Sequence, residues 1–343
     1  MRSRRVLLLT HPDLIPPKRL RGHSEQEISA WRTEYDVVTT LRRSGHDVSV
    51  LGVSHGLAPI REEIERFKPH VVFNLLEEFH GEAVYDHSVV SYLDLLRVPY
   101  TGCGPRGLVL ARGKDLSKKL VHYHRVPVPA FAVFPIGRKV RRPPRLALPL
   151  IVKSVSEDAS MGIAQASVVE TDEALAERVA FMHERIGTAA IAEQYIEGRE
   201  VYVSVLGNSR RRVLPVWELY FGELGQGRRP IATERLKHDV DYQTRHRVMQ
   251  GPATDLPEAV AARIMGLARR ICRTLELDGY ARIDFRLSSD LTPYFIDANP
   301  NPEISRNEEF ALAADYDGIK YPDLLNRILA LGISRSKPSH AHR

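Results

Sequence analysis

The sequence predicts an α/β protein whose C-terminal half changes to α+β. In the first hundred residues, short apolar strands alternate with amphipathic helices, as in a parallel sheet that is covered on both faces. After about residue 149 the apolar segments follow one another with few helices between them, which indicates antiparallel sheet. A length of 343 residues exceeds what one ordinary core supports, so we expect two or three closely packed domains.

The N-terminal third carries the α/β pattern. Strands are expected at 5–10, 47–53 and 71–74, and helices at 34–44 and 60–67. The first of these helices places Tyr35, Val38 and Leu41 on one face and stops at Gly45. Residues 11–27, which precede it, are rich in proline and charge and are unusually long for a connection of this kind, so we expect a functional or mobile loop.

The rest of the chain is richer in strands. Strands are expected at 149–155, 164–170, 189–196, 199–207, 211–219, 279–287 and 292–300, with helices after Thr171 and Asp172 and over 256–277. Residues 288–292 predict the turn between the last two strands. Residues 138–149 hold five Lys or Arg residues and three prolines, which marks a domain boundary or an exposed loop between strands.

Composition and charge narrow the class of protein. With 43% hydrophobic and 27% charged residues, the chain reads as globular rather than disordered or fibrous. Basic residues exceed acidic ones by 49 to 43, which suits a polyanionic ligand such as a nucleotide but does not indicate nucleic-acid binding. The apolar run at 6–9 is far too short for a signal peptide or membrane span, so we expect a cytoplasmic protein. Cys103 and Cys272 form no CxxC pair and read as ordinary thiols.

The most informative segment, ARIDFRLSSDLTPYFIDANPNPE, places oxygen-bearing side chains on two successive strands. Asp297 and Asn299 are two residues apart and share one face of a strand, and a hairpin can set Asp284 opposite them. Oxygen ligands of this kind suit magnesium. The alternative is an Asx turn at the end of the hairpin. Arg282 can stabilise charge on a reacting phosphate or can simply pair with one of the aspartates.

Two lysines are candidate phosphate ligands. Lys153 lies within an apolar strand, where its charge is costly without a partner. For Lys114 on its own, a solvated helix face is the favoured interpretation. The segment around it is not a Walker A loop, because Leu108 stands where the first glycine should be and Asp115 follows the lysine, so a P-loop enzyme is disfavoured.

Two further segments suit a nucleotide. EDASMGIAQ follows the Lys153 strand, and its small residues, including Ser160 and Gly162, would let backbone N–H groups approach phosphates; a plain hairpin loop is the alternative. AEQYIEGRE offers Glu193 and Glu200 at the ends of two strands, where carboxylates can receive an adenine amino group and ribose hydroxyls. Exposed surface glutamates would look the same.

In this order the segments resemble the D-alanine–D-alanine ligases, a family with the ATP-grasp fold. VFNLLEEFHGE is similar to the family's VFN segment, and VPYTGCG with Lys114 ten residues later is similar to its YTG stretch and nucleotide lysine. PLIVKSVSEDASMGI resembles its second lysine and phosphate-covering loop, and AEQYIEGREVYVSVLG its adenine- and ribose-binding strand. GYARIDFRL and FIDANPNP resemble its arginine, magnesium ligands and final Asn-Pro motif. The resemblance extends over nearly the whole chain.

The resemblance implies the cofactors and a role for each candidate residue. ATP and Mg²⁺ are expected, with two metal ions in the site and Mn²⁺ able to substitute. The implied assignments are Lys114 and Lys153 on the phosphates, Ser160 and Gly162 in the covering loop, Glu193 and Glu200 on the nucleoside, Asp284, Asp297 and Asn299 on the metals, and Arg282 and Lys237 as catalytic residues. The implied reaction transfers the γ-phosphoryl group to a substrate carboxylate, after which an amine attacks the acyl-phosphate.

The departures from the family pattern fall on the substrate side. THPDLIPPKR replaces a Gly-Gly-Ser loop, Glu77 stands in place of a histidine, and Asp297 replaces a glutamate. Glu303 stands where a glycine is usual, and NEEF replaces a serine-containing stretch that holds the acceptor. We place Glu77, Glu303, Ser305 and Arg306 in the substrate site.

These departures predict an unusual acceptor. Because Glu303 is joined by Glu308 and Glu309, we expect an acceptor that lacks a simple free α-carboxylate or brings a cation. An inward-turned Arg306 would reverse the argument, and a Glu303 that faces solvent would remove it.

We therefore expect a carboxylate–amine ligase with altered specificity, in an ATP-grasp fold whose N-terminal part is an α/β parallel-sheet domain. Ordinary D-alanine–D-alanine ligation and a nucleotide-binding regulatory protein without ligase activity remain alternatives. The expected parts are 1–112, 113–198 and 199–335, with a tail at 336–343. The expected partners are small carboxylate and amine substrates, either amino acids or peptide-like molecules, without nucleic acid or membrane, and a homodimer by analogy.

Overall fold

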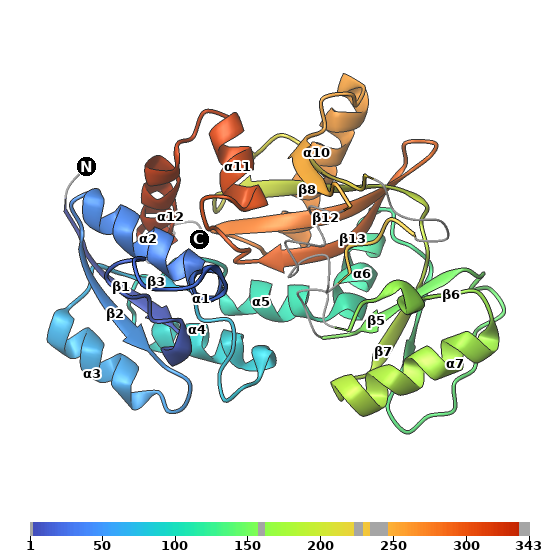
Figure 1. Cartoon of the computed structure of the whole chain (residues 1–343), viewed down its shortest axis with the longest axis horizontal. Helices are drawn as coiled ribbons and strands as arrows, with labels where there is room; N and C mark the ends of the chain where they lie inside the picture. Colours follow the sequence, from blue (N-terminus) through green and yellow to red (C-terminus); the bar gives the residue numbers. More distant parts are fainter. Residues whose placement is uncertain (1–2, 157–161, 223–228, 234–245, 336–343) are drawn as a thin grey trace, which may run out of the picture.

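Three β-sheets organise the chain (Figure 1). The structure is a computed structural model that describes residues 3–156, 162–222, 229–233 and 246–335. Each sheet comes from one stretch of sequence, and the strands of the second and third sheets are antiparallel throughout. The predicted change from α/β to α+β is therefore confirmed.

The first sheet is parallel. It has the order β2-β1-β3, with β1 at Arg5–Thr10, β2 at Asp47–Gly52 and β3 at Val71–Asn74. Alternate residues of β1 enter two separate cores: Leu7 and Leu9 pack on the side of α3 (Ala58–Phe67), and Val6 and Leu8 on the side of α2 (Arg32–Arg43). Burial on both faces explains why β1 is a continuous apolar run.

The second sheet has the order β4-β7-β5-β6 and carries α7 (Asp172–Phe181) on one face. Its strands are β4 (Phe131–Phe134), β5 (Leu150–Ser154), β6 (Val168–Val169) and β7 (Ala190–Gln194). Thr171 caps α7 by accepting a hydrogen bond from the N–H of Ala174. The strand expected at 164–170 is wrong for most of its length, because residues Gln165–Ser167 form a 3₁₀ turn and only two residues pair.

The third sheet contains the predicted hairpin. Its order is β11-β10-β8-β12-β13, with β9 also paired to β8. The strands are β8 (Gly198–Leu206), β9 (Arg212–Val213), β10 (Trp217–Tyr220), β11 (Met249–Pro252), β12 (Tyr280–Ser288) and β13 (Pro293–Pro300). The single strand expected at 211–219 is split in two around Pro215, a residue that has no N–H to donate to a neighbouring strand.

Helices join and cover the sheets. They are α1 (Glu25–Ala30), α4 (Asp86–Leu95), α5 (Pro105–Arg112), α6 (Lys114–Tyr123), α10 (Glu258–Thr274), α11 (Glu309–Tyr316) and α12 (Tyr321–Arg335), with short turns at Pro12–Leu14 and Ala83–Tyr85 and a π-helical turn at Met182–Ile186. Figure 1 shows α5 running between the first sheet and the other two. In the described part of the chain, no helix is both long and apolar enough to cross a membrane.

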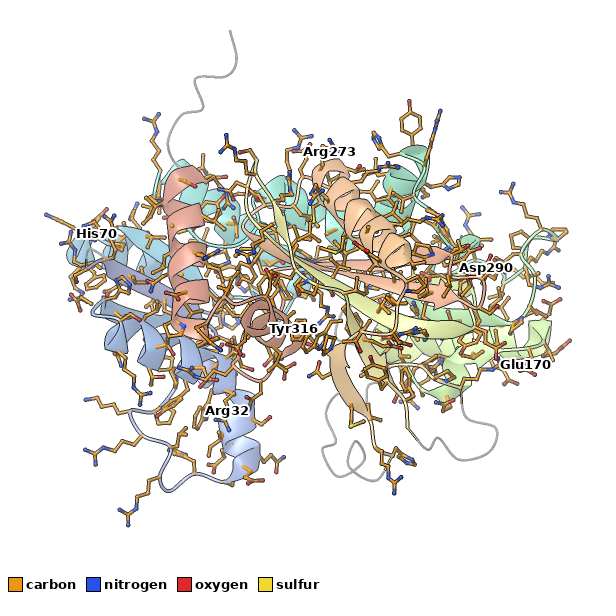
Figure 2. The ribbon with its side chains drawn as sticks, turned by 90° about the horizontal axis from the view of Figure 1, so that it is seen from above. Arg32, His70, Glu170, Arg273, Asp290 and Tyr316 are labelled. Carbon is orange, nitrogen blue, oxygen red and sulfur yellow. The ribbon has the colours of Figure 1, made fainter. Side chains whose placement is uncertain are left out.

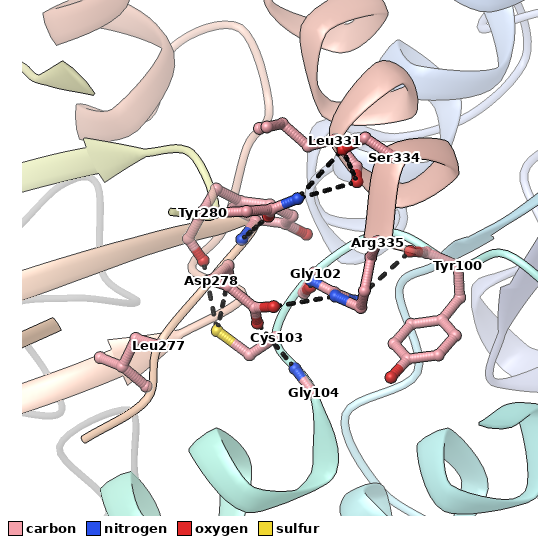
Figure 3. Close-up of polar contacts among 12 residues, drawn as sticks. Tyr100, Gly102, Cys103, Gly104, Leu277, Asp278, Tyr280, Leu331, Ser334 and Arg335 are labelled. Atoms are coloured by element: carbon pink, nitrogen blue, oxygen red, sulfur yellow. Dashed lines mark hydrogen bonds and ion pairs between the residues drawn. The ribbon is translucent and has the colours of Figure 1, made fainter. Parts of the chain in front are cut away.

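A polar network ties the first sheet's side of the molecule to the C-terminal helix (Figure 3). Asp278 accepts a hydrogen bond from the N–H of Gly104 at 3.0 Å and an ion-paired bond from Arg335 Nε at 2.8 Å. Asn301 receives the N–H of Cys103 at 2.6 Å, immediately after the β12–β13 hairpin. Residues 101–104, α12 and the end of β13 are thereby fixed to one another.

Candidate active site

A pocket lies between the second and third sheets and collects most of the predicted nucleotide residues. Its walls come from β5, β7, β8, β12 and β13 and from residues 231 and 232. The lining residues used below are Lys114, Lys153, Glu193, Tyr195, Ile196, Glu200, Tyr202, Asp284, Arg286, Asp297 and Asn299. Figure 2 shows Asp290, at the β12–β13 turn, and Glu170, just before α7, towards one end of the molecule and His70 at the other.

The hairpin holds the predicted metal ligands. The β12–β13 register sets Asp284 opposite Asp297, and Arg282 opposite Asn299. Asn299 Nδ2 donates to Asp284 Oδ2 at 2.9 Å, and Arg282 donates to both carboxylate oxygens of Asp284 at 2.8 and 3.0 Å. The hairpin also has an Asx turn, but Asp290 makes it by accepting the N–H of Thr292. Asp284, Asp297 and Asn299 are not part of that turn, and all three line the pocket.

Three lysines, from α6 and β5, lie close to Asp297 and Glu193. Lys114, the first residue of α6, places Nζ 3.1 Å from Asp297 Oδ2. Lys153 Nζ lies 3.4 Å from one carboxylate oxygen of Glu193, and Lys118 Nζ lies 3.3 Å from the other. Burial of these charges is tolerated because each ammonium group has a carboxylate partner.

Sequence reasoning missed Lys118, whose side chain is 0% exposed. Its Nζ also donates to the backbone carbonyl oxygen of Ile296. The available signal was its spacing: it follows Lys114 by four residues in a helix, so both side chains project from one face. Burial lowers the pKa of Lys118. Burial alone would raise the pKa of Asp297, but the positive charges of Lys114 and Lys118 bring it below its usual value.

Glu200 lies at the other end of the pocket and is held by two donors. Tyr202 donates its hydroxyl to Glu200 Oε1 at 2.7 Å, and Arg286 Nη1 donates to Oε2 at 3.2 Å. Sequence reasoning also missed Arg286, although residues 282, 284 and 286 share one face of a strand. Of the phosphate-loop candidates, Gly162 is described and its carbonyl oxygen accepts a hydrogen bond from Arg178, while Ser160 lies outside the described residues. Lys237 likewise lies outside them.

The predicted substrate residues Glu303 and Ser305 lie in the segment that follows β13, near Arg282. Glu303 Oε1 accepts hydrogen bonds from the Thr33 hydroxyl at 3.0 Å and the Ser305 hydroxyl at 3.4 Å. Glu309 Oε2 lies 3.4 Å from Arg282 Nη1, which links these carboxylates to the Asp284 end of the pocket.

Two other candidates lie at the edges of this region. Arg306 turns towards α2, where it donates to the Thr40 hydroxyl at 2.5 Å and covers the ring of Tyr321 at 4.4 Å. Its guanidinium group therefore does not offset the nearby glutamates. Glu77, in the loop that follows β3, is exposed.

Four carboxyl groups gather on this side: Glu34, Glu303, Glu308 and Glu309. Loss of surrounding water and the charges of Glu303 and Glu309 raise the pKa of Glu308 to about 8. Glu303 is exposed as a residue, which weakens the argument from its charge, but burial of its carboxyl group and the charge of Glu309 raise its pKa. Burial likewise raises the pKa of Glu34. The raised pKa values of Glu34, Glu303 and Glu308 mean that this cluster takes up protons more readily than isolated carboxyl groups do.

Comparison with known proteins shows which family has this fold and site. The family model described as D-ala D-ala ligase C-terminus matches residues 120–330. A D-alanine–D-alanine ligase of Bordetella petrii is 34% identical over 254 residues, 73% of each chain, and an uncharacterized protein of Sinorhizobium fredii is 32% identical over 305 residues, 85% of each chain. The solved D-alanine–D-alanine ligase of Bacillus anthracis complexed with ATP has the same fold, with a TM-score of 0.74, 18% identity and coverage of 98% of this chain and 99% of that one.

A parallel α/β domain followed by two antiparallel sheets that enclose a lysine- and carboxylate-lined pocket defines an ATP-grasp enzyme, here an ATP-dependent ligase that forms C–N bonds. The chain belongs to the D-alanine–D-alanine ligase-like family of this class.

Proposed function

We propose that this ligase joins a small carboxylate substrate to an amine other than D-alanine, using ATP and magnesium. The observation that carries the altered specificity is the cluster of four carboxyl groups beside Arg282, with Arg306 paired elsewhere. An amino acid acceptor would bring its own carboxylate into this region and meet like charge. The favoured acceptor is an amide, a diamine or another molecule with a positive or neutral group in that position.

The pocket residues suit ATP in one orientation. Lys114 and Lys153 place positive charge near Asp297, so they are assigned to the phosphates. Glu193 and Glu200 are assigned to the nucleoside. The Ser160 and Gly162 loop is assigned to cover the phosphates, on the strength of the sequence pattern alone.

The metal assignment is supported by the chemistry of the donor set. Two carboxylates and one amide, Asp284, Asp297 and Asn299, present only oxygen ligands once the amide nitrogen is bonded to Asp284. Such a set fits Mg²⁺, and Mn²⁺ as a substitute, and nucleotide phosphates would complete the coordination of two ions. Bound metal would supply neutralisation of charge on the transferred phosphoryl group.

The proposed reaction has two steps. The substrate carboxylate attacks the γ-phosphorus of ATP, ADP leaves, and an acyl-phosphate remains. The acceptor nitrogen then attacks the acyl carbon, the C–O bond to phosphate breaks, and inorganic phosphate leaves as the nitrogen loses a proton. Arg282, oriented by its two bonds to Asp284, is assigned to stabilise the developing charge, and Lys237 is kept as a second catalytic candidate.

The test measures phosphate release with ATP, Mg²⁺ and pooled amino acids or dipeptides, followed by single acceptors. We expect amino acid amides and diamines to outperform D-alanine in the wild type, and Glu303→Gly to shift the preference towards D-alanine. Efficient D-alanyl-D-alanine formation that Glu303→Gly leaves unchanged would reject the altered specificity and favour the function named for the Bordetella relative. Nucleotide binding without phosphate release for any acceptor would favour a regulatory role.

Other expectations remain part of this proposal. The division into 1–112, 113–198 and 199–335 is supported by the three sheets, whose strands span 5–74, 131–194 and 198–300. The tail at 336–343 lies outside the described residues. A cytoplasmic location and a homodimer are retained as predictions, and gel filtration with light scattering tests the second.

A further inference from the structure

We propose that Arg286 is a positioning residue for nucleotide recognition: it orients the Glu200 carboxylate towards the ribose hydroxyls and thereby sets the preference for ribonucleotides over deoxyribonucleotides. The inference rests on the proposed function, because it takes Glu200 as the ribose ligand. Arg286 itself belongs to none of the roles assigned above.

The register of the third sheet brings the two residues together. Arg286 on β12 lies directly opposite Glu200 on β8, and its Nη1 donates to Glu200 Oε2 at 3.2 Å. Tyr202 donates to the other oxygen at 2.7 Å. A carboxylate has about four acceptor positions, so two donors fix its plane and leave about two positions for a ligand. The arrangement suits a vicinal pair of hydroxyl groups.

The guanidinium group is itself anchored. Its Nε donates to the carbonyl oxygen of Ile196 at 3.1 Å, Nη1 also donates to that of Pro230 at 2.8 Å, and Nη2 lies 3.4 Å from the Tyr195 hydroxyl. The Arg286 side chain is 8% exposed. Since all three nitrogens are engaged with protein atoms, we expect Arg286 to act through Glu200 rather than by contacting the nucleotide.

The chemistry requires arginine at this place. The planar fork reaches two backbone carbonyls, a phenol and a carboxylate at once, whereas the single ammonium group of lysine cannot satisfy all of them in fixed directions. Without Arg286, Glu200 keeps the bond from Tyr202 but can rotate about it. The loss should therefore fall on ribose recognition.

The experiment measures dissociation constants by calorimetry for ATP, 2′-deoxy-ATP and 3′-deoxy-ATP with Mg²⁺, using the full chain. The wild type should prefer ATP over at least one deoxynucleotide by about tenfold, the scale of one hydrogen bond to a charged group. Arg286→Met and Glu200→Gln should each bring this ratio to about one to threefold, and the double variant should match Glu200→Gln alone. Arg286→Lys should retain only part of the ratio.

Arg199→Met is the matched control. Arg199 is also on β8 and pairs with Glu218 and Asp255, but it does not line the pocket, so its loss should leave the ratio unchanged. If Arg286→Met fails to fold, Arg286→Lys and Tyr202→Phe carry the test, since each weakens one support of Glu200.

The possible failures are distinguishable. If the folded wild type binds no ATP, the proposed function fails and this inference with it. If ATP binds but Arg286→Met and Arg286→Lys keep the wild-type ratio, only the inference fails. Additive losses in the double variant would show direct contact between Arg286 and the nucleotide and would overturn the positioning role.

Discussion

Lys114 Nζ lies 3.1 Å from Asp297 Oδ2, so a phosphate-ligand candidate on α6 and a metal-ligand candidate on β13 are joined in one ion pair. Lys114 is buried and Asp297 is half-buried, which strengthens their attraction. A nucleotide and its metal would exchange this contact for separate ones, with the ammonium on phosphate and the carboxylate on the cation. The expected phosphate ligand and the expected metal ligand are thus in direct contact with each other.

The metal assignment predicts the effect of three substitutions. Asp284→Asn, Asp297→Ala and Asn299→Ala should each lower kcat by about 100-fold or more, because uncompensated charge on the transferred phosphoryl group raises the barrier. Circular dichroism should show folded proteins. Steady-state ATP turnover over a range of Mg²⁺ concentrations provides the measurement, and near-wild-type turnover in two of the three variants would reject the assignment.

Lys118 predicts a combined loss of stability and nucleotide affinity. Lys118→Met leaves Glu193 with Lys153 as its remaining partner and removes the bond to the Ile296 carbonyl. Breaking a buried pair in this way costs about 3 kcal/mol or more. Denaturant unfolding measures the loss, and ATP binding should weaken in parallel. Lys119→Met is the control, because Lys119 is exposed and pairs with Asp115 in its own helix.

Glu308 predicts how stability depends on pH. Its raised pKa, about 8 against an ordinary 4.5, means that the folded state binds this proton more tightly than the unfolded state does. The stability contribution is therefore complete below pH 4.5 and falls as the pH rises to about 8. At pH 9 the free energy of unfolding of Glu308→Gln, measured with denaturant, should exceed that of the wild type by about 1 kcal/mol. At pH 4.5 the two proteins should differ little. Glu62→Gln, on an exposed position of α3, should show neither effect.

Gly102 predicts a steric limit beside the hairpin. It has φ +87°, and a Cβ there would lie 2.3 Å from Asn301 Oδ1. Gly102→Ala should therefore lower the free energy of unfolding by about 2–4 kcal/mol. Gly45→Ala, at a similar φ of +84° with open space around it, should cost only about 1 kcal/mol. Equal losses for the two variants would show that the contact with Asn301 carries no cost.

The parts of this structure that could be predicted from sequence are those fixed by local periodicity. The twofold alternation of a strand placed Asp297 beside Asn299 and opposite Asp284, as the register confirms. Lys118 and Arg286 were missed because what distinguishes them is a partner far along the chain, Glu193 for one and Glu200 for the other. Their spacing from recognised residues was visible, but periodicity alone does not separate a buried cation from a solvated one.

The acidic region shows the same limit. The sequence indicated three of its members, Glu303, Glu308 and Glu309, because they are close along the chain. Glu34 joins them from α2, far earlier in the chain, and it was expected only as part of a helix. Where Arg306 points also depended on Asp36 and Thr40 of that helix. Both depend on tertiary packing, which no local pattern encodes.

The bonds that Asp278 and Asn301 make to residues 103, 104 and 335 also determine which parts of the molecule can move apart. They hold residues 103 and 104, which follow the bridge between Val72 and Tyr100 at the first sheet, against the third sheet. The first and third sheets therefore form one unit, and this unit carries the β12–β13 hairpin. The second sheet forms the other side of the pocket. The short connection from Gln194 to Gly198 is one of the places where the chain passes from the second sheet to the third. We therefore expect the pocket to admit a nucleotide by movement of the second sheet, while the carboxylates of the hairpin stay in place.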